Sequence, residues 1–202
     1  MGNLPDDEAA LIRAAQRGSL DAFNSLVLRY QDAVFTTAYR IMGEAQTAAD
    51  IAQDAFITAY RQIGTFRGGA FRAWLLRIAA NRCYDELRRH KRHPTVSVER
   101  MGSEESADAP DLPDPSETPE QIALSNELQR AIQDCIRALG AEQRVVLVMS
   151  DIDGLDYESI AKAIGAALGT VKSRLSRARA AVRDCLSGLG ELLPAEFRLS
   201  RS

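Results

Sequence analysis

Residues 155–182 have the sequence LDYESIAKAIGAALGTVKSRLSRARAAV, and this stretch decides the fold. Its first part places a short helix's apolar side chains on one side: Tyr157, Ile160, Ala161 and Ile164. Its last part has an apolar stripe at helical spacing: Val171, Leu175, Ala178 and Val182. Between them, Gly165 can adopt the positive φ angle that a tight corner requires. The pattern predicts two short helices joined by a turn, a helix-turn-helix.

The second helix of this pair has a strongly basic outer face. Opposite its apolar stripe lie Lys172, Ser173, Ser176 and Arg177, with Arg174 and Arg179 at the flanks. Arginine forks and short hydroxyls suit contacts with base edges and phosphates in the major groove. The alternative is an ordinary amphipathic hairpin. The absence of acidic residues between 159 and 183 disfavours it, because a solvated face normally mixes both signs.

Charge is unevenly distributed along the chain. The 202 residues include 25 basic and 28 acidic side chains, a net charge of -3, but residues 61–93 alone carry +7. Residues 160–183 contain 6 basic and no acidic side chains. Separate basic blocks within an acidic chain indicate a polyanionic partner, although charge runs can also be plain solvated surface.

An acidic, proline-rich stretch divides the chain. Residues 96–119 contain four prolines and almost no large apolar side chains, so they should form a flexible linker. Helical periodicity and abundant alanine on both sides predict an all-α fold of two small helical domains. We expect domains at 1–95 and 120–186 and a C-terminal tail at 187–202. Gly18, Gly43 and Gly64 follow periodic runs, where they could end helices.

The first half contains two further patterns. Asp50, Gln53 and Asp54 form a polar strip on one helix face, with apolar residues opposite. Next, aromatic residues alternate with arginines, as in proteins that hold unstacked bases and grip the backbone. The candidate contacts there are Arg67, Arg72, Trp74, Arg77, Asn81, Arg82, Asp85, Arg88 and Arg89. Trp74 could instead belong to the core, Asn81 could cap a helix, and the polar strip could be a solvated face.

These segments together resemble bacterial sigma factors of the sigma-70 family, in the extracytoplasmic-function group. The segments DYESIA at 156–161 and GTVKSRLSRAR at 169–179 are similar to the region 4 helix-turn-helix, which in that family recognises the promoter -35 element. The resemblance implies -35 contacts by Thr170, Lys172, Ser173, Arg174, Ser176, Arg177 and Arg179. The segment ADIAQDAF at 49–56 resembles region 2.2, which implies that Asp50, Gln53 and Asp54 bind core RNA polymerase.

The arginine-rich segment 66–92 resembles regions 2.3 and 2.4, which read and help to melt the -10 element. Asn81 would then hold a flipped-out base, since an amide offers both a donor and an acceptor. The resemblance further implies three partners: core polymerase through its β′ coiled coil and β flap, promoter DNA, and an anti-sigma protein. A conventional duplex-DNA regulator and a helical RNA-binding adaptor remain the alternatives.

No enzymatic motif was found, so we expect a regulatory protein without catalytic activity, cofactor or metal. A weak metal candidate comprises Cys83, Glu86, His90 and His93, but the surrounding arginines oppose a cation. Three cysteines, an odd number, argue against a disulfide framework and for a reducing, cytoplasmic location. The longest apolar run is residues 145–149, too short for a membrane span, and the acidic N-terminus does not resemble a signal peptide.

Overall fold

A computed structural model describes residues 7–92 and 119–188, with side chains from residue 126 onward in the second range. All of the predicted linker except Pro119, which begins α5, and most of the C-terminal tail lie outside these ranges. The elements are α1(Glu8–Gln16), α2(Leu20–Met42), α3(Ala45–Gln62), the 3-10 turn η1(Ile63–Thr65), α4(Phe71–Arg92), α5(Pro119–Arg137), α6(Ala141–Leu147), the π-helical turn η2(Val148–Ile152), α7(Tyr157–Ile164) and α8(Leu168–Ser187). The described residues contain no strand, which confirms the all-α prediction.

Local capping explains where several helices begin and end. The Asp156 carboxylate accepts a hydrogen bond from the Ser159 backbone N–H at 2.8 Å, which caps α7. Gly165, at φ 62°, ends the same helix in the left-handed conformation and confirms the predicted corner. Gly43 ends α2 in the same way, at φ 81°. The expectation for Gly64 was wrong, because it lies within η1, which continues the chain beyond α3.

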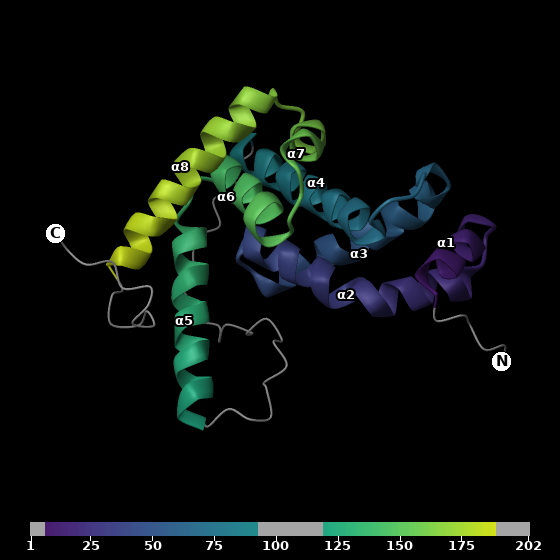
Figure 1. The fold of residues 1–202 in the computed structure, drawn as a ribbon, viewed down its shortest axis with the longest axis horizontal. Coiled ribbons are helices and arrows are strands. Elements are labelled where there is room, and N and C mark those ends of the chain that lie inside the picture. The colour runs from purple at the N-terminus through teal and green to yellow at the C-terminus, as the bar shows by residue number, and fades with distance from the viewer. Residues whose placement is uncertain (1–6, 93–118, 189–202) are drawn as a thin grey trace.

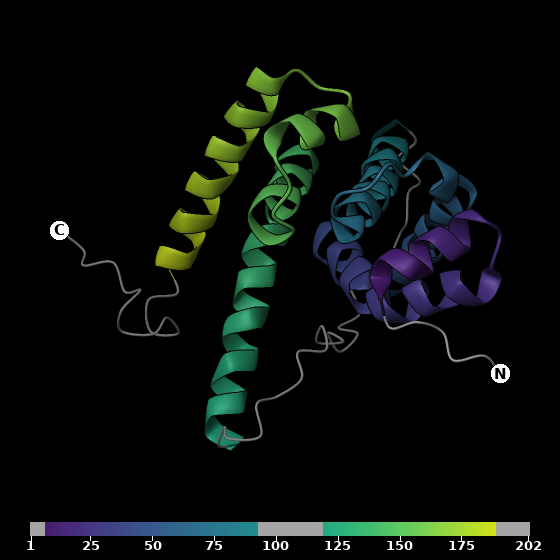
Figure 2. The same cartoon turned by 45° about the vertical axis from the view of Figure 1, so that its right-hand side comes forward.

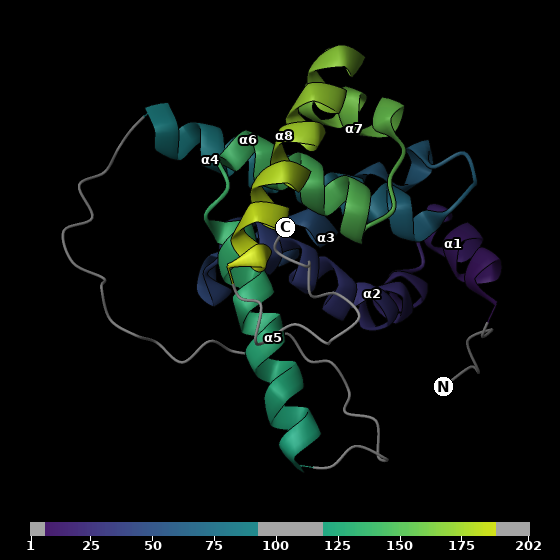
Figure 3. The same ribbon diagram turned by 60° about the vertical axis from the view of Figure 1, so that its left-hand side comes forward.

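Helices α1–α4 form a first module and α5–α8 a second (Figure 1). The views of Figures 2 and 3 show α5 projecting away from the body at its N-terminal end, with α8 alongside its other end. In the second module α8 packs on both α5 and α6, and α7 lies against α4 of the first module. The predicted helix-turn-helix is therefore present, and its first helix contacts the other half of the chain.

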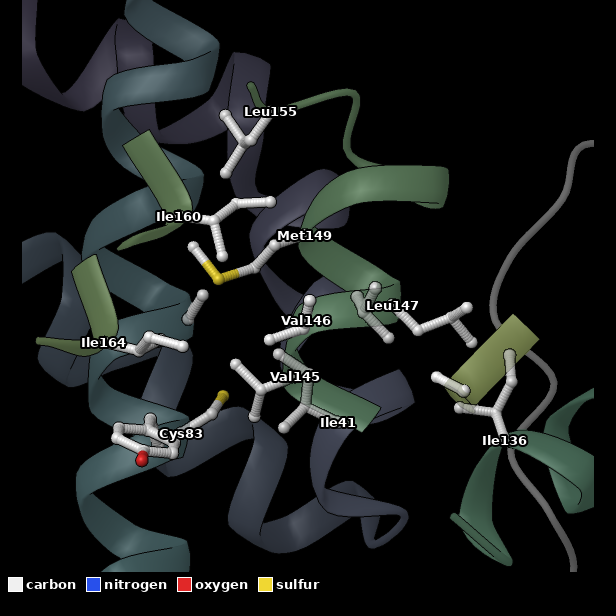
Figure 4. Close-up of a cluster of buried hydrophobic side chains, with 14 of the residues drawn as sticks. Ile41, Cys83, Ile136, Val145, Val146, Leu147, Met149, Leu155, Ile160 and Ile164 are labelled. Atoms are coloured by element: carbon white, nitrogen blue, oxygen red, sulfur yellow. The ribbon is translucent and has the colours of Figure 1, made fainter. Parts of the chain in front are cut away.

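The buried side chains form two clusters. One lies wholly within the first module and is centred on Phe71, Leu75 and Leu76. The other is shared between the modules: Ile41 and Cys83 of the first module lie beside Val145 of the second (Figure 4). Met149, Ile160 and Ile164 continue this second cluster between the modules and the helix-turn-helix. The sequence had indicated a separate small core for each half.

A disulfide joins Cys135 on α5 to Cys185 on α8. The expectation from the odd number of cysteines was therefore wrong. The two helices run together and bring residues 50 positions apart to a Cα–Cα distance of 5.8 Å, within the range for this bond. Cys83 is the remaining cysteine, and it is a free thiol buried in the shared cluster.

Among the helices that the structure describes, none has both the length and the apolar character needed to cross a bilayer.

Candidate nucleic-acid and polymerase interfaces

The polar strip of α3 is exposed, as predicted. Asp50, Gln53 and Asp54 all face solvent, while Ile51 and Ala55 on the opposite side are buried. Within the described part of the chain, the strip's side chains make one long hydrogen bond, from the Gln46 amide to the Asp50 carboxylate at 3.4 Å. The strip is consequently available to a partner helix, and its two carboxylates would complement basic side chains.

Sequence reasoning missed an apolar residue that extends this strip. Ile57 follows Asp54 by three positions, so it lies on the same helix face, and 43% of it is exposed. Tyr60, which is 37% exposed, lies one turn further along. An exposed isoleucine beside acidic side chains is the usual composition of a binding patch with an apolar centre. The helical spacing of positions 50, 53, 54 and 57 was the sequence signal that could have placed Ile57 on this face.

An aromatic cluster lies where α4 begins. The Trp74 ring is 5.5 Å from that of Phe66 and 5.3 Å from that of Phe71, measured between ring centroids. Trp74 is half-buried, so it supports the core with part of its surface and leaves the rest exposed. It lines an open cleft of about 540 Å³ together with Arg67 and Arg77. Two cationic side chains beside an aromatic surface could hold a base and its phosphate.

Several predicted -10 residues share one line along α4. Trp74, Arg77, Asn81, Asp85 and Arg88 recur at three- and four-residue steps, which places them on one face. Asn81 lies well inside α4, which ends at Arg92, so it does not cap the helix. Its Oδ1 atom is buried and has no hydrogen-bond partner among the described residues. A buried amide oxygen without a partner is costly, and this one could accept from a base amino group only once it is exposed.

Several arginines of α4 have partners within the chain. Arg82 donates to the Thr58 hydroxyl at 2.7 Å, and Arg72 approaches the Asp153 carbonyl oxygen at 3.5 Å. Arg89 binds Glu86 through two nitrogens, which lowers the pKa of that carboxyl group. Arg88 lies over the Tyr84 ring at 5.7 Å from its centroid. Arg67, Arg72, Arg82, Asp85, Arg88 and Arg89 are nevertheless exposed, and nucleic-acid backbone could contact them.

The outer face of α8 has the predicted composition. Lys172, Ser173, Ser176 and Arg177 are exposed, while Val171, Leu175 and Ala178 are buried on the opposite side. The Arg177 Nε atom donates to the Ser173 carbonyl oxygen at 3.2 Å, and the terminal nitrogens of the guanidinium have no hydrogen-bond partner among the described residues. Thr170 is half-buried. Leu168, 38% exposed, adds an apolar side chain at the start of the helix that sequence reasoning did not single out.

The two flanking arginines of α8 are bound within the second module. Arg174 forms an ion pair with Glu142 at 2.6 Å, and only 16% of its side chain is exposed. Arg179 donates to both Asp151 carboxylate oxygens, at 2.8 and 2.7 Å. This contact lowers the pKa of Asp151 and raises that of Arg179. Both arginines fix α8 against the preceding segment, so they position the outer face of α8 more than they extend it.

The weak metal candidate is not assembled in the described part of the chain. Cys83 is fully buried, and burial raises the pKa of its thiol to about 12. Glu86 binds Arg89 and His90 outside the core, and His93 lies outside the described residues. No group of three or more potential metal ligands occurs among the residues that the structure describes.

Comparison with protein families finds two matches in this order along the chain. Residues 26–93 match the family model of sigma-70 region 2, and residues 129–182 match that of sigma-70 region 4. The first range contains the α3 strip and the -10 candidates, and the second contains the helix-turn-helix.

Similar proteins cover nearly the whole chain. The RNA polymerase sigma-H factor of Pseudomonas aeruginosa is 36% identical over 91% of this chain and 96% of its own length. The ECF RNA polymerase sigma-E factor of Escherichia coli is 36% identical over 87% of this chain and 92% of its own length. Among solved structures, the sigma factor RpoE of Bartonella quintana, bound to the anti-sigma factor NepR, is 25% identical with a TM-score of 0.59, covering 83% of this chain and 98% of that one.

Proposed function

Because this chain belongs to the sigma-70 family of RNA polymerase sigma factors, in the extracytoplasmic-function group, we propose that it directs core RNA polymerase to specific promoters. The first module would bind polymerase through the α3 strip and capture the -10 element along α4. The second would read the -35 element with α8. The observation that carries this proposal is the conjunction of two distinct faces: an exposed acidic strip on α3 and an exposed acid-free reading face on α8.

The remaining assignments rest on this proposal. We place domain boundaries at residues 95 and 120. We also propose a cytoplasmic location, because the protein would act together with polymerase and promoter DNA. The protein would act by redirecting polymerase and not by catalysing a reaction itself. An anti-sigma protein is a further proposed partner, supported by the complex of the similar Bartonella quintana factor.

The proposal is tested by gel filtration with bacterial core RNA polymerase. We expect the wild-type chain to co-elute with polymerase and a triple Asp50→Ala, Gln53→Ala, Asp54→Ala variant to elute separately. These side chains are exposed, so removing them spares the fold. The matched control changes two exposed carboxylates and one exposed amide on α2: Asp21→Ala, Gln31→Ala and Asp32→Ala.

The control should co-elute like the wild type. Failure of the wild type to co-elute, combined with tight duplex binding by the chain alone, would favour a polymerase-independent regulator. Co-elution of the triple variant would keep the family function and remove the α3 strip as the docking face.

The -35 assignment gives a second prediction. Replacing the exposed Arg177 with alanine should weaken binding to a cognate duplex by about 1–3 kcal/mol and relax sequence preference at one position. The measurement is selection of bound duplexes from a random-sequence library by the holoenzyme, followed by sequencing. Arg183→Ala on the same helix is the charge-matched control and should leave the selected sequence unchanged. An unchanged sequence with Arg177→Ala would show that this side chain reads no base.

A further inference from the structure

Helix α1 carries none of the polymerase or DNA contacts assigned above. It covers Glu8–Gln16 and precedes residues 26–93, the range that matches the region 2 family model. Its apolar side chains are buried in the first module's own cluster: Leu11, Ile12 and Ala15. This packing places α1 at the same end of the module as η1 (Figure 1). Burial explains why α1 docks there, but not the polar contacts that it makes at both of its ends.

The last residue of α1 holds the segment between α3 and α4. The Gln16 side-chain amide donates to the carbonyl oxygen of Ile63 at 3.1 Å and to that of Phe66 at 2.9 Å. These carbonyls lie 47 and 50 positions further along the chain. An amide nitrogen has two N–H donors, so both are used on this segment. Two directional bonds from one side chain define where the segment sits relative to α1.

The segment that Gln16 holds forms one wall of the cleft described above. Residues 65–68 line this cleft of about 540 Å³. Gly68 and the glycine that follows it, Gly69, have φ angles of 100° and 91°. Consecutive glycines allow many backbone conformations, so local sequence restrains this segment little. The position of Arg67 in the cleft wall therefore depends on contacts made from elsewhere in the chain.

The first residue of α1 reaches the same region by a second route. Glu8 accepts a hydrogen bond from the Tyr30 hydroxyl of α2. The Tyr30 ring lies 5.7 Å from that of Phe71, and the Phe71 ring lies 5.4 Å from that of Phe66, measured between centroids. Helix α1 thus supports the aromatic cluster around Trp74 from two sides, with a carboxylate at its beginning and an amide at its end.

We propose that Gln16 is a positioning residue for the -10 reading cleft: it fixes the segment 63–70 and thereby sets which base the cleft accepts, without contacting DNA. A binding site discriminates between similar ligands only when supporting residues hold its walls to within about 0.5 Å. Gln16 is exposed and could be fully hydrated, so its two bonds to backbone carbonyls are not required by burial. The effect on reading rests on the proposed -10 function of the cleft, whereas the positioning role does not.

Three variants separate the role of the amide from that of the helix. Gln16→Met removes both donors and keeps the length of the side chain. Gln16→Arg is the rescue variant, because a guanidinium has several N–H donors that can bind both carbonyl oxygens. Gln31→Met, at an exposed position of α2, is the matched control. Both glutamines are exposed, so none of these changes leaves a cavity in the core.

Trp74 is the single tryptophan of the chain, so its fluorescence reports on the cleft directly. Its ring lies 5.5 Å from that of Phe66, whose carbonyl oxygen Gln16 binds. With Gln16→Met we expect acrylamide to quench Trp74 more strongly and the emission maximum to move to longer wavelength, because the cleft wall shields the ring less. Gln16→Arg should return both values to those of the wild type, and Gln31→Met should leave them unchanged.

The second measurement is selection by the holoenzyme from duplexes randomised over both promoter elements, followed by sequencing. With Gln16→Met, the preference for the best base at one -10 position should fall about fivefold, the scale of one net hydrogen bond. The -35 preference should not change, because Gln16 contacts only the first module through these bonds. Gln16→Arg should restore the -10 preference, although its added charge strengthens binding to every sequence.

Each other outcome overturns a defined part of the proposal. Unchanged Trp74 quenching in Gln16→Met would refute the positioning role, and so would a change that Gln16→Arg does not reverse. Altered quenching with an unchanged -10 preference would refute the effect on reading. Equal loss of preference at both elements would refute a role confined to the cleft. If the wild-type holoenzyme selects no -10 sequence, the proposed -10 function fails, while the fluorescence result still decides the positioning role.

Discussion

Loss of the Cys135–Cys185 disulfide is expected to lower the free energy of unfolding by about 4 kcal/mol. The bond closes a loop of 50 residues, and opening it returns chain entropy to the unfolded state. The native structure adds a second reason. The buried side chains of α8 end at Ala178, so the disulfide is the covalent link that holds its exposed C-terminal third to α5.

The measurement is a urea unfolding curve with and without a thiol reductant. We expect the midpoint of the wild type to fall on reduction and that of a Cys135→Ser, Cys185→Ser variant to equal the reduced value in both conditions. Thiol titration provides the control, because the reduced chain should expose Cys83 only after unfolding. Equal midpoints for fully oxidised and fully reduced wild type would contradict the prediction.

The disulfide also bears on the proposed cytoplasmic location. Stable disulfides are rare in reducing compartments, and those found there are usually transient or redox-sensing. Cys185 is exposed, so a small reductant can reach the bond. The oxidised and reduced forms of the chain are therefore expected to differ in the stability of the second module.

The helix-turn-helix could be predicted in detail because its determinants are local. The stripe of Val171 and Leu175, the Asp156 cap and the Gly165 corner all act within a few residues. The same locality made the α3 strip predictable, since helical period alone places Asp50, Gln53 and Asp54 together. Helical period does not indicate what these faces bind: the basic composition of the α8 face favoured DNA, and the polymerase-binding role of the α3 strip was implied by the family resemblance.

Features that depend on distant partners could not be predicted. The ion pairs of Arg174 with Glu142 and of Arg179 with Asp151 cross 32 and 28 positions, so the charge count treated both arginines as part of the reading face. The disulfide joins residues that share no local pattern. The contact of Thr37 with Asp153 spans 116 positions and requires the modules to be packed together. Sequence pattern indicates which side of a helix is buried, but not which distant element buries it.

Asp153→Asn is expected to stabilise the chain at neutral pH by up to about 3 kcal/mol. Asp153 is only 8% exposed, and burial raises the pKa of its carboxyl group from 3.8 to about 6. The Thr37 hydroxyl and the Arg72 and Arg40 guanidinium groups oppose this rise and do not cancel it. One carboxylate oxygen, Oδ2, is buried without a partner among the described residues. The asparagine keeps an acceptor for Thr37 and removes the buried charge.

The sign of the pH dependence follows from the raised pKa. The folded state binds the Asp153 proton more tightly than the unfolded state, so its contribution to stability is fully present below about pH 4. That contribution is lost as the pH rises through 6, where the folded carboxyl group ionises. We therefore expect the wild type and Asp153→Asn to differ little at pH 4 and to diverge progressively up to pH 7.5.

Urea unfolding at pH 4, 5, 6 and 7.5 measures this difference. Asp151→Asn is the comparison, because Asp151 binds Arg179 and its pKa is lowered, so the opposite sign is expected. A gap between wild type and Asp153→Asn that does not change with pH would show that Asp153 stays ionised throughout.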